Sequence, residues 1–310
     1  MKKIIIVVLM LLLGSCASPT IPGSETNRLA VVTTSYPVAQ FVEHVGKELV
    51  EVNLITKGSS NTHTYDPTPK DLLDMNEAAL LFYTNEAMEP WIDGLKLSLK
   101  ETVTVVDTSV GIDFIQGHDH GHEENHDDSH EELHGFGDPH IWTSMKNAQI
   151  MVSNIEQALI DQLPEEKATI QVNAQAYQAQ LKQLDQEYET VFQQANQQKL
   201  VFLGHFAFNY LLRDYAFDYT VLYESLSHES EPTAAKVKEV IDYIQEENLR
   251  YVFKEELADD RIVEAVLETT EALTLELHGA HVLSSEDLAE QVSFIQLQQR
   301  NIENLRVGLQ

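Results

Sequence analysis

A run of histidines and carboxylates between Gly117 and His140 carries the most evident chemistry in this sequence. Six of the thirteen histidines lie between His118 and His134, among seven carboxylates and without Lys or Arg. Neutral imidazole and carboxylate are ligands for borderline divalent cations such as Zn²⁺. We therefore expect this tract to collect metal ions weakly, at several positions. Its histidines are His118, His120, His122, His126, His130 and His134.

The tract also contains two matches to the zinc-protease pattern H-E-x-x-H, which begin at His122 and His130. That chemistry needs both imidazoles on one face of a buried helix, with the glutamate beside a zinc-bound water. Leu133 is the single large apolar residue in the tract, which therefore has no face to bury and should be loosely held. We expect a metal-collecting loop and not an enzyme.

Four other positions place histidine in sequence that is typical of ordered structure. His63, His205 and His278 each follow a predicted strand, and His140 precedes a predicted helix. Ligands of open α/β sheets bind beyond the carboxyl ends of the strands. We therefore predict that these four residues form a specific metal site in a cleft. His281 and a water molecule are the alternatives to His278 as the fourth ligand.

The elements that must position these histidines form two series in which strands alternate with helices. The expected strands are Leu29–Thr34, Val50–Ile55, Ala79–Tyr83, Val103–Val106, Leu200–Leu203, Tyr219–Leu222, Tyr251–Phe253 and Leu273–Leu277. The expected helices are Val38–Lys47, Pro69–Met75, Met145–Leu163, Ala234–Glu247, Asp260–Leu273 and Ser285–Arg306. This alternation predicts an α/β fold of two lobes, each built on a mostly parallel sheet.

One long helix is expected between the two series, over residues 164–198. The segment has no Gly and no internal Pro, its apolar or small residues recur at alternating spacings of three and four, and Pro164 suits a first helical turn. We predict that it joins an amino-terminal lobe, residues 29–163, to a carboxyl-terminal lobe, residues 199–310. The histidine-rich loop, 117–137, belongs to the first lobe. A coiled-coil dimer seam is the alternative for the long helix.

The first residues have the pattern of a secretion signal. Lys2 and Lys3 precede the apolar run Ile4–Leu13, which is too short to span a bilayer but suits a signal peptide over residues 1–15. The following Cys16 ends a bacterial lipobox-like sequence and is the expected lipidation site. Residues 16–28 are then a tether, and the protein is extracytoplasmic and anchored to the cell membrane. The net charge of −30 disfavours nucleic acid as a partner.

Several motifs together resemble the metal-binding lipoproteins of bacterial ABC importers, the cluster that carries zinc or manganese. The matching stretches are Thr33–Pro37, His63–Pro69, Asp138–Trp142, His205–Leu211 and Glu229–Thr233. The resemblance covers nearly the whole mature chain. It implies two βα lobes joined by one rigid helix, metal ligands at His63, His140 and His205, an ABC permease as the partner, and a monomer.

The choice of metal depends on two positions at which related families differ. Manganese-binding members carry a carboxylate at the third ligand position, where this chain has His205, and family members often place Asp or Glu where this chain has His278. Imidazole suits zinc, while carboxylate oxygen suits manganese. We therefore expect a high-affinity zinc receptor that delivers Zn²⁺ to the permease. A manganese receptor of the same family and a surface adhesin that uses zinc structurally are the alternatives.

Overall fold

The computed structural model describes residues 28–57, 62–115, 137–223, 232–255 and 261–310. The predictions for the signal peptide, for lipidation at Cys16 and for the histidine tract fall outside these ranges. Within them, no helix combines the length and the apolar composition that crossing a bilayer requires.

Two four-stranded parallel sheets form the frame of the molecule. The first contains β1 (Leu29–Thr33), β2 (Val50–Leu54), β3 (Leu80–Tyr83) and β4 (Thr104–Asp107), in the order β2-β1-β3-β4. The second contains β5 (Lys199–Leu203), β6 (Asp218–Val221), β7 (Tyr251–Lys254) and β8 (Leu273–Glu276), in the order β6-β5-β7-β8. The eight expected strands and the α/β fold of two parallel-sheet lobes are confirmed. Each strand end lies within one residue of its expected position.

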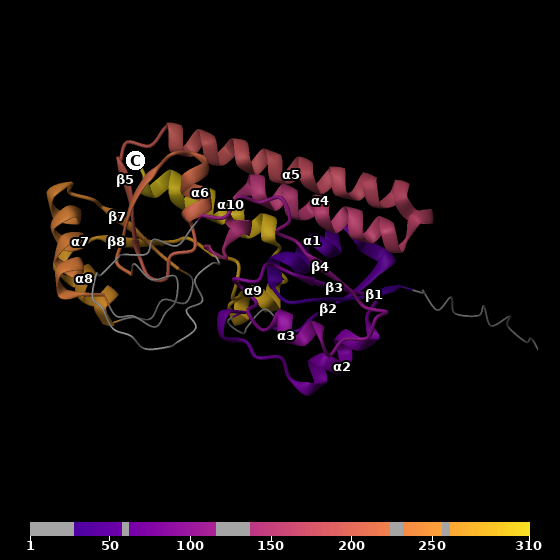
Figure 1. Ribbon diagram of the computed structural model, residues 1–310. Coiled ribbons are helices and arrows are strands. Elements are labelled where there is room, and N and C mark those ends of the chain that lie inside the picture. Colours follow the sequence, from indigo (N-terminus) through magenta and orange to yellow (C-terminus); the bar gives the residue numbers. More distant parts are fainter. Residues whose placement is uncertain (1–27, 58–61, 116–136, 224–231, 256–260) are drawn as a thin grey trace, which may run out of the picture.

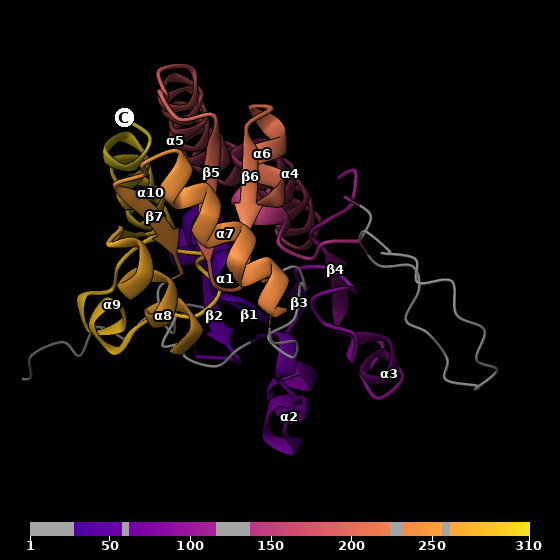
Figure 2. The ribbon, with the colours of Figure 1, turned by 90° about the vertical axis from the view of Figure 1, so that its left-hand side faces the viewer.

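Helices cover both faces of each sheet, which explains why central strands such as β3 are buried throughout. One shared layer contains α1 (Tyr36–Gly46), α4 (Met145–Gln162), α5 (Lys167–Gln193) and α10 (Phe294–Gly308). The opposite face of the first sheet packs against α2 (Pro69–Glu77) and α3 (Ile92–Lys96). The opposite face of the second sheet packs against α7 (Ala234–Glu246) and α8 (Arg261–Thr270). Figure 2 shows α2 and α3 at the opposite end of the view from α5, and Figure 1 shows α7 and α8 at the far end of the molecule from α4.

The long helix α5 spans both lobes, as Figure 1 shows. Its 27 residues correspond to a length of about 40 Å, and a 3₁₀ turn at Pro164–Glu166 joins it to α4, which runs antiparallel beside it. Its amino-terminal half contacts α1, where the Tyr177 and Phe41 rings lie 5.9 Å apart. Its carboxyl-terminal half contacts α10, where Tyr188 donates to Gln298 Oε1 at 2.7 Å. The apolar face predicted from the sequence is therefore covered by the chain's own helices.

The carboxyl-terminal segment returns to the amino-terminal lobe and ties the two lobes together. The hydroxyl of Tyr36 donates to the Val292 carbonyl, and the Phe294 amide donates to Gln40 Oε1 at 3.2 Å. Phe294 also packs edge-on against Phe41, with ring centroids 5.0 Å apart. The largest apolar cluster consequently contains residues from both lobes. The lobes share one core along α5.

The single helix expected over Ser285–Arg306 is wrong, because the chain makes two helices there. The first, α9 (Ser285–Glu290), ends at Gln291, which adopts a left-handed conformation with φ of 52°. Ser293 then begins α10 through a capping box with Gln296. The helix expected over Asp260–Leu273 likewise ends early, because Glu271 is left-handed and the chain enters β8. The short helices α3 and α6 (Asn209–Asp214) were not predicted.

The shared core makes a specific prediction for α5. Leu181 is fully buried in the core between the lobes, whereas Val172 on the same helix is 65% exposed. Leu181→Ala should lower the free energy of unfolding by about 2–5 kcal/mol, because it removes buried methyl groups and leaves a cavity. Val172→Ala should change it by less than about 0.5 kcal/mol. Urea denaturation of the metal-free protein measures both, and similar values for the two variants would contradict the packing described.

Candidate metal centre

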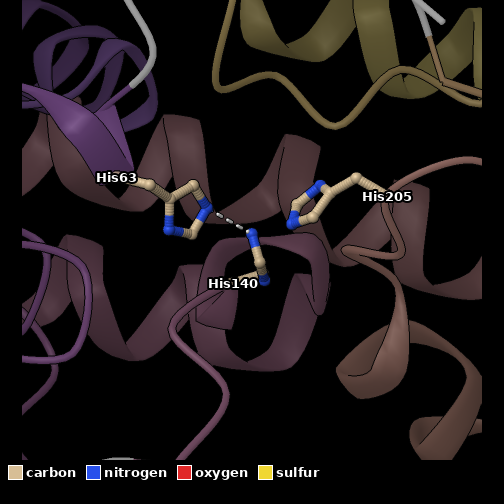
Figure 3. Close-up of side chains that lie close together, drawn as sticks. All are labelled: His63, His140 and His205. Carbon is tan, nitrogen blue, oxygen red and sulfur yellow. Dashed lines mark hydrogen bonds between the residues drawn. The ribbon is translucent and has the colours of Figure 1, made fainter. Parts of the chain in front are cut away.

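Three of the four predicted histidines meet where the two sheets face each other. His63 follows β2, His140 precedes α4, and His205 follows β5. One ring nitrogen from each lies within 4.8 Å of the others. The ring centroids are 4.9 Å apart for His63 and His140, 4.8 Å for His140 and His205, and 5.4 Å for His63 and His205. Figure 3 shows the three imidazoles converging from separate elements.

The His63 loop is held by hydrogen bonds to the start of α2. His63 lies in a short 3₁₀ turn, Thr62–Thr64. The hydroxyl of Tyr65 donates to Asp71 Oδ2 at 2.7 Å, and the same carboxylate closes the capping box with Thr68. The turn thereby directs His63 Nε2 to within 2.9 Å of His140 Nε2, the contact drawn in Figure 3.

A buried carboxylate orients the ring of His140. Asp138 Oδ1 lies 2.7 Å from His140 Nδ1 and accepts the His140 amide at 2.9 Å. An ionised carboxylate only accepts hydrogen bonds, so Nδ1 carries the ring proton and Nε2 presents its lone pair to the cluster. The other oxygen of Asp138 accepts from Asn209 Nδ2 at 2.7 Å. Although burial opposes ionisation, His140 and these hydrogen bonds lower the pKa of Asp138.

The loop that carries His140 is also fixed from the first sheet. Asn85, directly after β3, donates from Nδ2 to the Pro139 carbonyl at 2.9 Å. Asn85 is in turn held by Glu89, whose carboxylate accepts the Asn85 amide and the Thr34 hydroxyl. Burial raises the pKa of Glu89 to about 7, although these hydrogen bonds oppose that rise. This network connects the ends of β1 and β3 to the metal-facing loop.

The position of His205 depends on Gly204 and Glu255. Gly204 has φ of 143°, a conformation that glycine adopts without strain. A Cβ atom there would lie 3.3 Å from Glu255 Oε1. The turn brings the His205 amide to Glu255 Oε1 at 3.1 Å, and His205 Nδ1 lies 3.6 Å from Oε2. The other ring nitrogen faces His140 (Figure 3).

The ring of His281 lies beside the three converging rings. The centroid of His281 is 5.6 Å from that of His205, 6.0 Å from that of His140 and 6.1 Å from that of His63. The preceding Ala280 is left-handed, with φ of 60°, and this turn redirects the chain after β8. The indole of Trp142 donates to the Gly279 carbonyl at 2.8 Å and ties the turn to the amino-terminal lobe.

His278 was predicted as the fourth site residue, and both of its ring nitrogens lie near other groups. Its Nδ1 accepts the Ala280 amide at 2.9 Å, and its Nε2 faces Asp287 Oδ2 at 3.8 Å. Asn301 of α10 holds its backbone through two hydrogen bonds of 2.7 and 3.0 Å. Among the described residues, neither group with metal-ligand spacing includes His278. It shapes the turn that carries His281.

Burial keeps His140 and His281 in the form that binds metal. Desolvation lowers the pKa of His140, against the opposing effect of Asp138. Desolvation and the neighbouring histidines lower the pKa of His281 well below its ordinary value. Neutral imidazole is the ligand form, so these shifts reduce competition by protons at neutral pH. Nitrogens of a tetrahedral zinc site are roughly 3.3 Å apart, so small side-chain movements would complete one here.

The family of the chain follows from a match over nearly its whole length. The family described as "zinc-uptake complex component A, periplasmic" (ZnuA) matches residues 31–308. The chain belongs to this family. The resemblance of the sequence motifs to the metal-binding lipoproteins of bacterial ABC importers is thus confirmed.

Individual relatives agree with this membership. The chain is 32% identical over 309 residues to the high-affinity zinc uptake system protein ZnuA of Bacillus subtilis, which covers 98% of this chain and 96% of that protein. It is 30% identical over 287 residues to the zinc-binding lipoprotein AdcA of Streptococcus pneumoniae, which covers 90% of this chain. The match spans 55% of AdcA, so that relative contains further sequence beyond the part shared with this chain.

Solved structures share the ZnuA-family fold. The metal-dependent lipoprotein YcdH of Bacillus subtilis superposes with a TM-score of 0.77 at 29% identity, over 91% of this chain and all of that one. The Zn(II)-bound ZnuA-like domain of Streptococcus pneumoniae AdcA superposes with a TM-score of 0.75 at 28% identity, over 91% of this chain and 99% of that one.

Sequence reasoning did not name the two carboxylates that lie behind the histidines. Asp138 stands in a quoted motif, two residues before His140, and its short spacing is a usable signal for an orienting partner. Glu255 directly follows β7 at the same sheet edge as His205. The sequence signal for Glu255 was a charged residue shortly after a predicted strand, where ligands of α/β sheets bind. The sequence pattern does not define the turn at Ala280, which separates His278 from His281.

The role of Asp138 is testable through the affinity for Zn²⁺. Asp138→Asn should weaken binding about ten- to a hundred-fold, because the amide no longer fixes the proton on His140 Nδ1. Asp161→Asn, on the exposed end of α4, is the matched control and should leave affinity unchanged. Competition against a chelator of known affinity measures both. Equal affinities of Asp138→Asn and the wild type would show that the carboxylate does not orient His140.

The buried His278 predicts how acid affects the metal-free protein. Burial lowers its pKa from 6.5 to about 4. Between these values the unfolded chain binds more protons than the folded chain, so the free energy of unfolding decreases as pH falls from 6.5 to 4. This group should contribute a loss on the order of 3 kcal/mol across the window. His278→Gln should therefore flatten the dependence, measured by urea denaturation at several pH values; parallel curves would contradict it.

Proposed function

We propose that this protein is an extracytoplasmic receptor that binds Zn²⁺ in the cleft between its lobes and delivers it to the permease of an ABC importer. The observation that supports this best is the convergence of buried imidazoles from both lobes. Membership of the ZnuA family supports the same metal and the same role, as do zinc uptake by the Bacillus relative and zinc binding by the Streptococcus relative.

The ligand set we propose is His63, His140, His205 and His281. We propose His281 in place of His278, the residue predicted from the sequence, because the centroid of its ring lies within 6.1 Å of the other three centroids. Four nitrogen donors suit tetrahedral Zn²⁺, whereas Mn²⁺ favours oxygen donors. Four protein donors also favour transport over catalysis, since a catalytic zinc keeps one position open for water.

The parts of the chain outside the described residues have proposed roles that follow from their composition. Lipidation at Cys16 would hold the receptor at the outer face of the cell membrane, with residues 16–28 as a tether. The tract from His118 to His134 would gather Zn²⁺ weakly and exchange it quickly, because a sequence with a single large apolar residue offers no core that would preorganise its imidazoles and carboxylates. The shared core along α5 supports a monomer that acts by small tilting of the lobes.

One titration with a panel of variants tests this function. The soluble protein that begins after Cys16 should bind one tight equivalent of Zn²⁺ in competition with a chelator. Replacing the six tract histidines by Ser should leave that equivalent in place, and His140→Ala should abolish it. Loss of tight binding in the tract variant together with its retention in His140→Ala would refute the cleft site.

The same titration tests the fourth ligand with a matched pair. His281→Ala should weaken Zn²⁺ binding at least about a hundred-fold, because it removes a donor from the metal. His278→Ala should weaken binding far less, since that ring faces Asp287 and acts only on the turn. The reverse order of the two affinities would restore His278 as the ligand.

A further inference from the structure

A second group of metal-ligating side chains shares the cleft with the four histidines. His205, Glu255 and His281 each offer a ligand atom, and these atoms lie within 4.8 Å of one another. All three residues are buried, with Glu255 8% exposed. Glu255 Oε1 already accepts the His205 amide at 3.1 Å, so Oε2 is the oxygen that faces the His205 ring. The carboxylate is therefore held in place before any ion arrives.

The fold places this group at a position suited to ligands. In the order β6-β5-β7-β8, the chain crosses from one side of β5 to the other, so the strand order reverses between β5 and β7. Open α/β sheets bind ligands in the crevice at such a reversal. His205 follows β5, and Glu255 follows β7, so the two residues flank that crevice. The positive φ of Gly204 allows the close approach of the two segments.

The two groups differ in which lobe supplies their members. His63 and His140 come from the amino-terminal lobe and face His205 across the cleft. His205, Glu255 and His281 all follow strands of the second sheet. Tilting of the lobes would separate the first group, whereas the second group would keep its spacing because one sheet carries it.

We propose that His205, Glu255 and His281 form a second metal position, on the carboxyl-terminal lobe alone, through which Zn²⁺ passes on release. This inference rests on the proposed receptor function. The bonds from the metal to His63, His140 and His205 Nε2 break, and bonds to Glu255 Oε2 and His205 Nδ1 form as the ring proton passes from Nδ1 to Nε2 through water, while His281 remains bound. The ion thus moves between positions without becoming fully hydrated.

The donor set of this second position suits an ion in transit. Two imidazoles and one carboxylate are a set that zinc accepts, and they leave the fourth position open to water. An open position allows the ion to exchange, whereas the closed set of four imidazoles does not. The second position lacks the ligands His63 and His140. The negative charge of Glu255 offsets the resulting cost of holding a divalent cation there.

Binding to the second position can be isolated by removing the amino-terminal ligands. The parent is the soluble protein that begins after Cys16, with the six tract histidines replaced by Ser so that they do not compete. The double variant His63→Ala/His140→Ala should still bind one equivalent of Co²⁺ or Zn²⁺, at least about a hundred-fold more weakly than the parent. Adding Glu255→Gln should weaken it about ten-fold more. The matched control is Glu276→Gln, a half-buried carboxylate at the end of β8.

Release kinetics separate a transit ligand from a residue that only orients His205. Glu255→Gln in the parent should slow the removal of Zn²⁺ by excess chelator several-fold, because the intermediate position loses its carboxylate. A residue that only orients His205 would have the opposite effect, because its loss would loosen the ligand and accelerate release. Absorption of the Co²⁺ complex should also lose intensity in the double variant, as the metal gains water.

Three outcomes would overturn the inference. These are faster release in Glu255→Gln, an unchanged affinity when Glu255→Gln is added to the double variant, and binding by the double variant no stronger than that of His63→Ala/His140→Ala/His205→Ala. Circular dichroism checks folding, and the pair His63→Gln/His140→Gln replaces the alanine pair if that pair unfolds. Failure of the parent to bind one tight Zn²⁺ would instead refute the proposed function.

Discussion

The metal centre depends on a core that the two lobes share along α5. A cluster of imidazoles contributed by two sheets is useful only if the sheets are held at one separation, and buried side chains on both halves of α5 provide that restraint. The return of the chain through Val292 and Phe294 to α1 adds a second connection. Close-packed protein interiors deform little. Packing therefore fixes the separation of the two lobes before a ligand arrives.

Buried polar contacts transmit this restraint to the individual ligands. Asp138, Asn85 and Trp142 each hold the loop around His140 or join it to an element of the other lobe. Leaving such groups unpaired in a low-dielectric interior would cost free energy, so each hydrogen bond also narrows the positions open to the loop. The same burial that lowers the pKa of His140 and His281 keeps them neutral and ready to bind.

Rigid lobes raise the question of how the ion leaves. A receptor that closed by wide hinge motion would release its ligand by opening, but a shared core restricts such motion to small tilts. Ligands that exchange within the cleft reduce the movement required, because each step breaks few bonds. The position of Glu255 beside His205 and His281 is consistent with this economy of motion. The turn around Gly279 is also held from both lobes, because Trp142 donates to the Gly279 carbonyl and Asn301 accepts the His278 amide.

The alternation of strands and helices, the long helix and three of the clustered histidines could all be predicted from the amino-acid sequence. These features follow from local periodicity and from short motifs such as Asp138–Trp142, and both depend only on residues that are near one another in the sequence. The preference we propose for His281 over His278 comes from the folded chain, because a left-handed residue at Ala280 and contacts from α10 place the His281 ring beside the other imidazoles and His278 Nε2 toward Asp287. Glu255 likewise joins the site because β7 lies next to β5, a neighbourhood that non-local packing creates and local sequence does not encode.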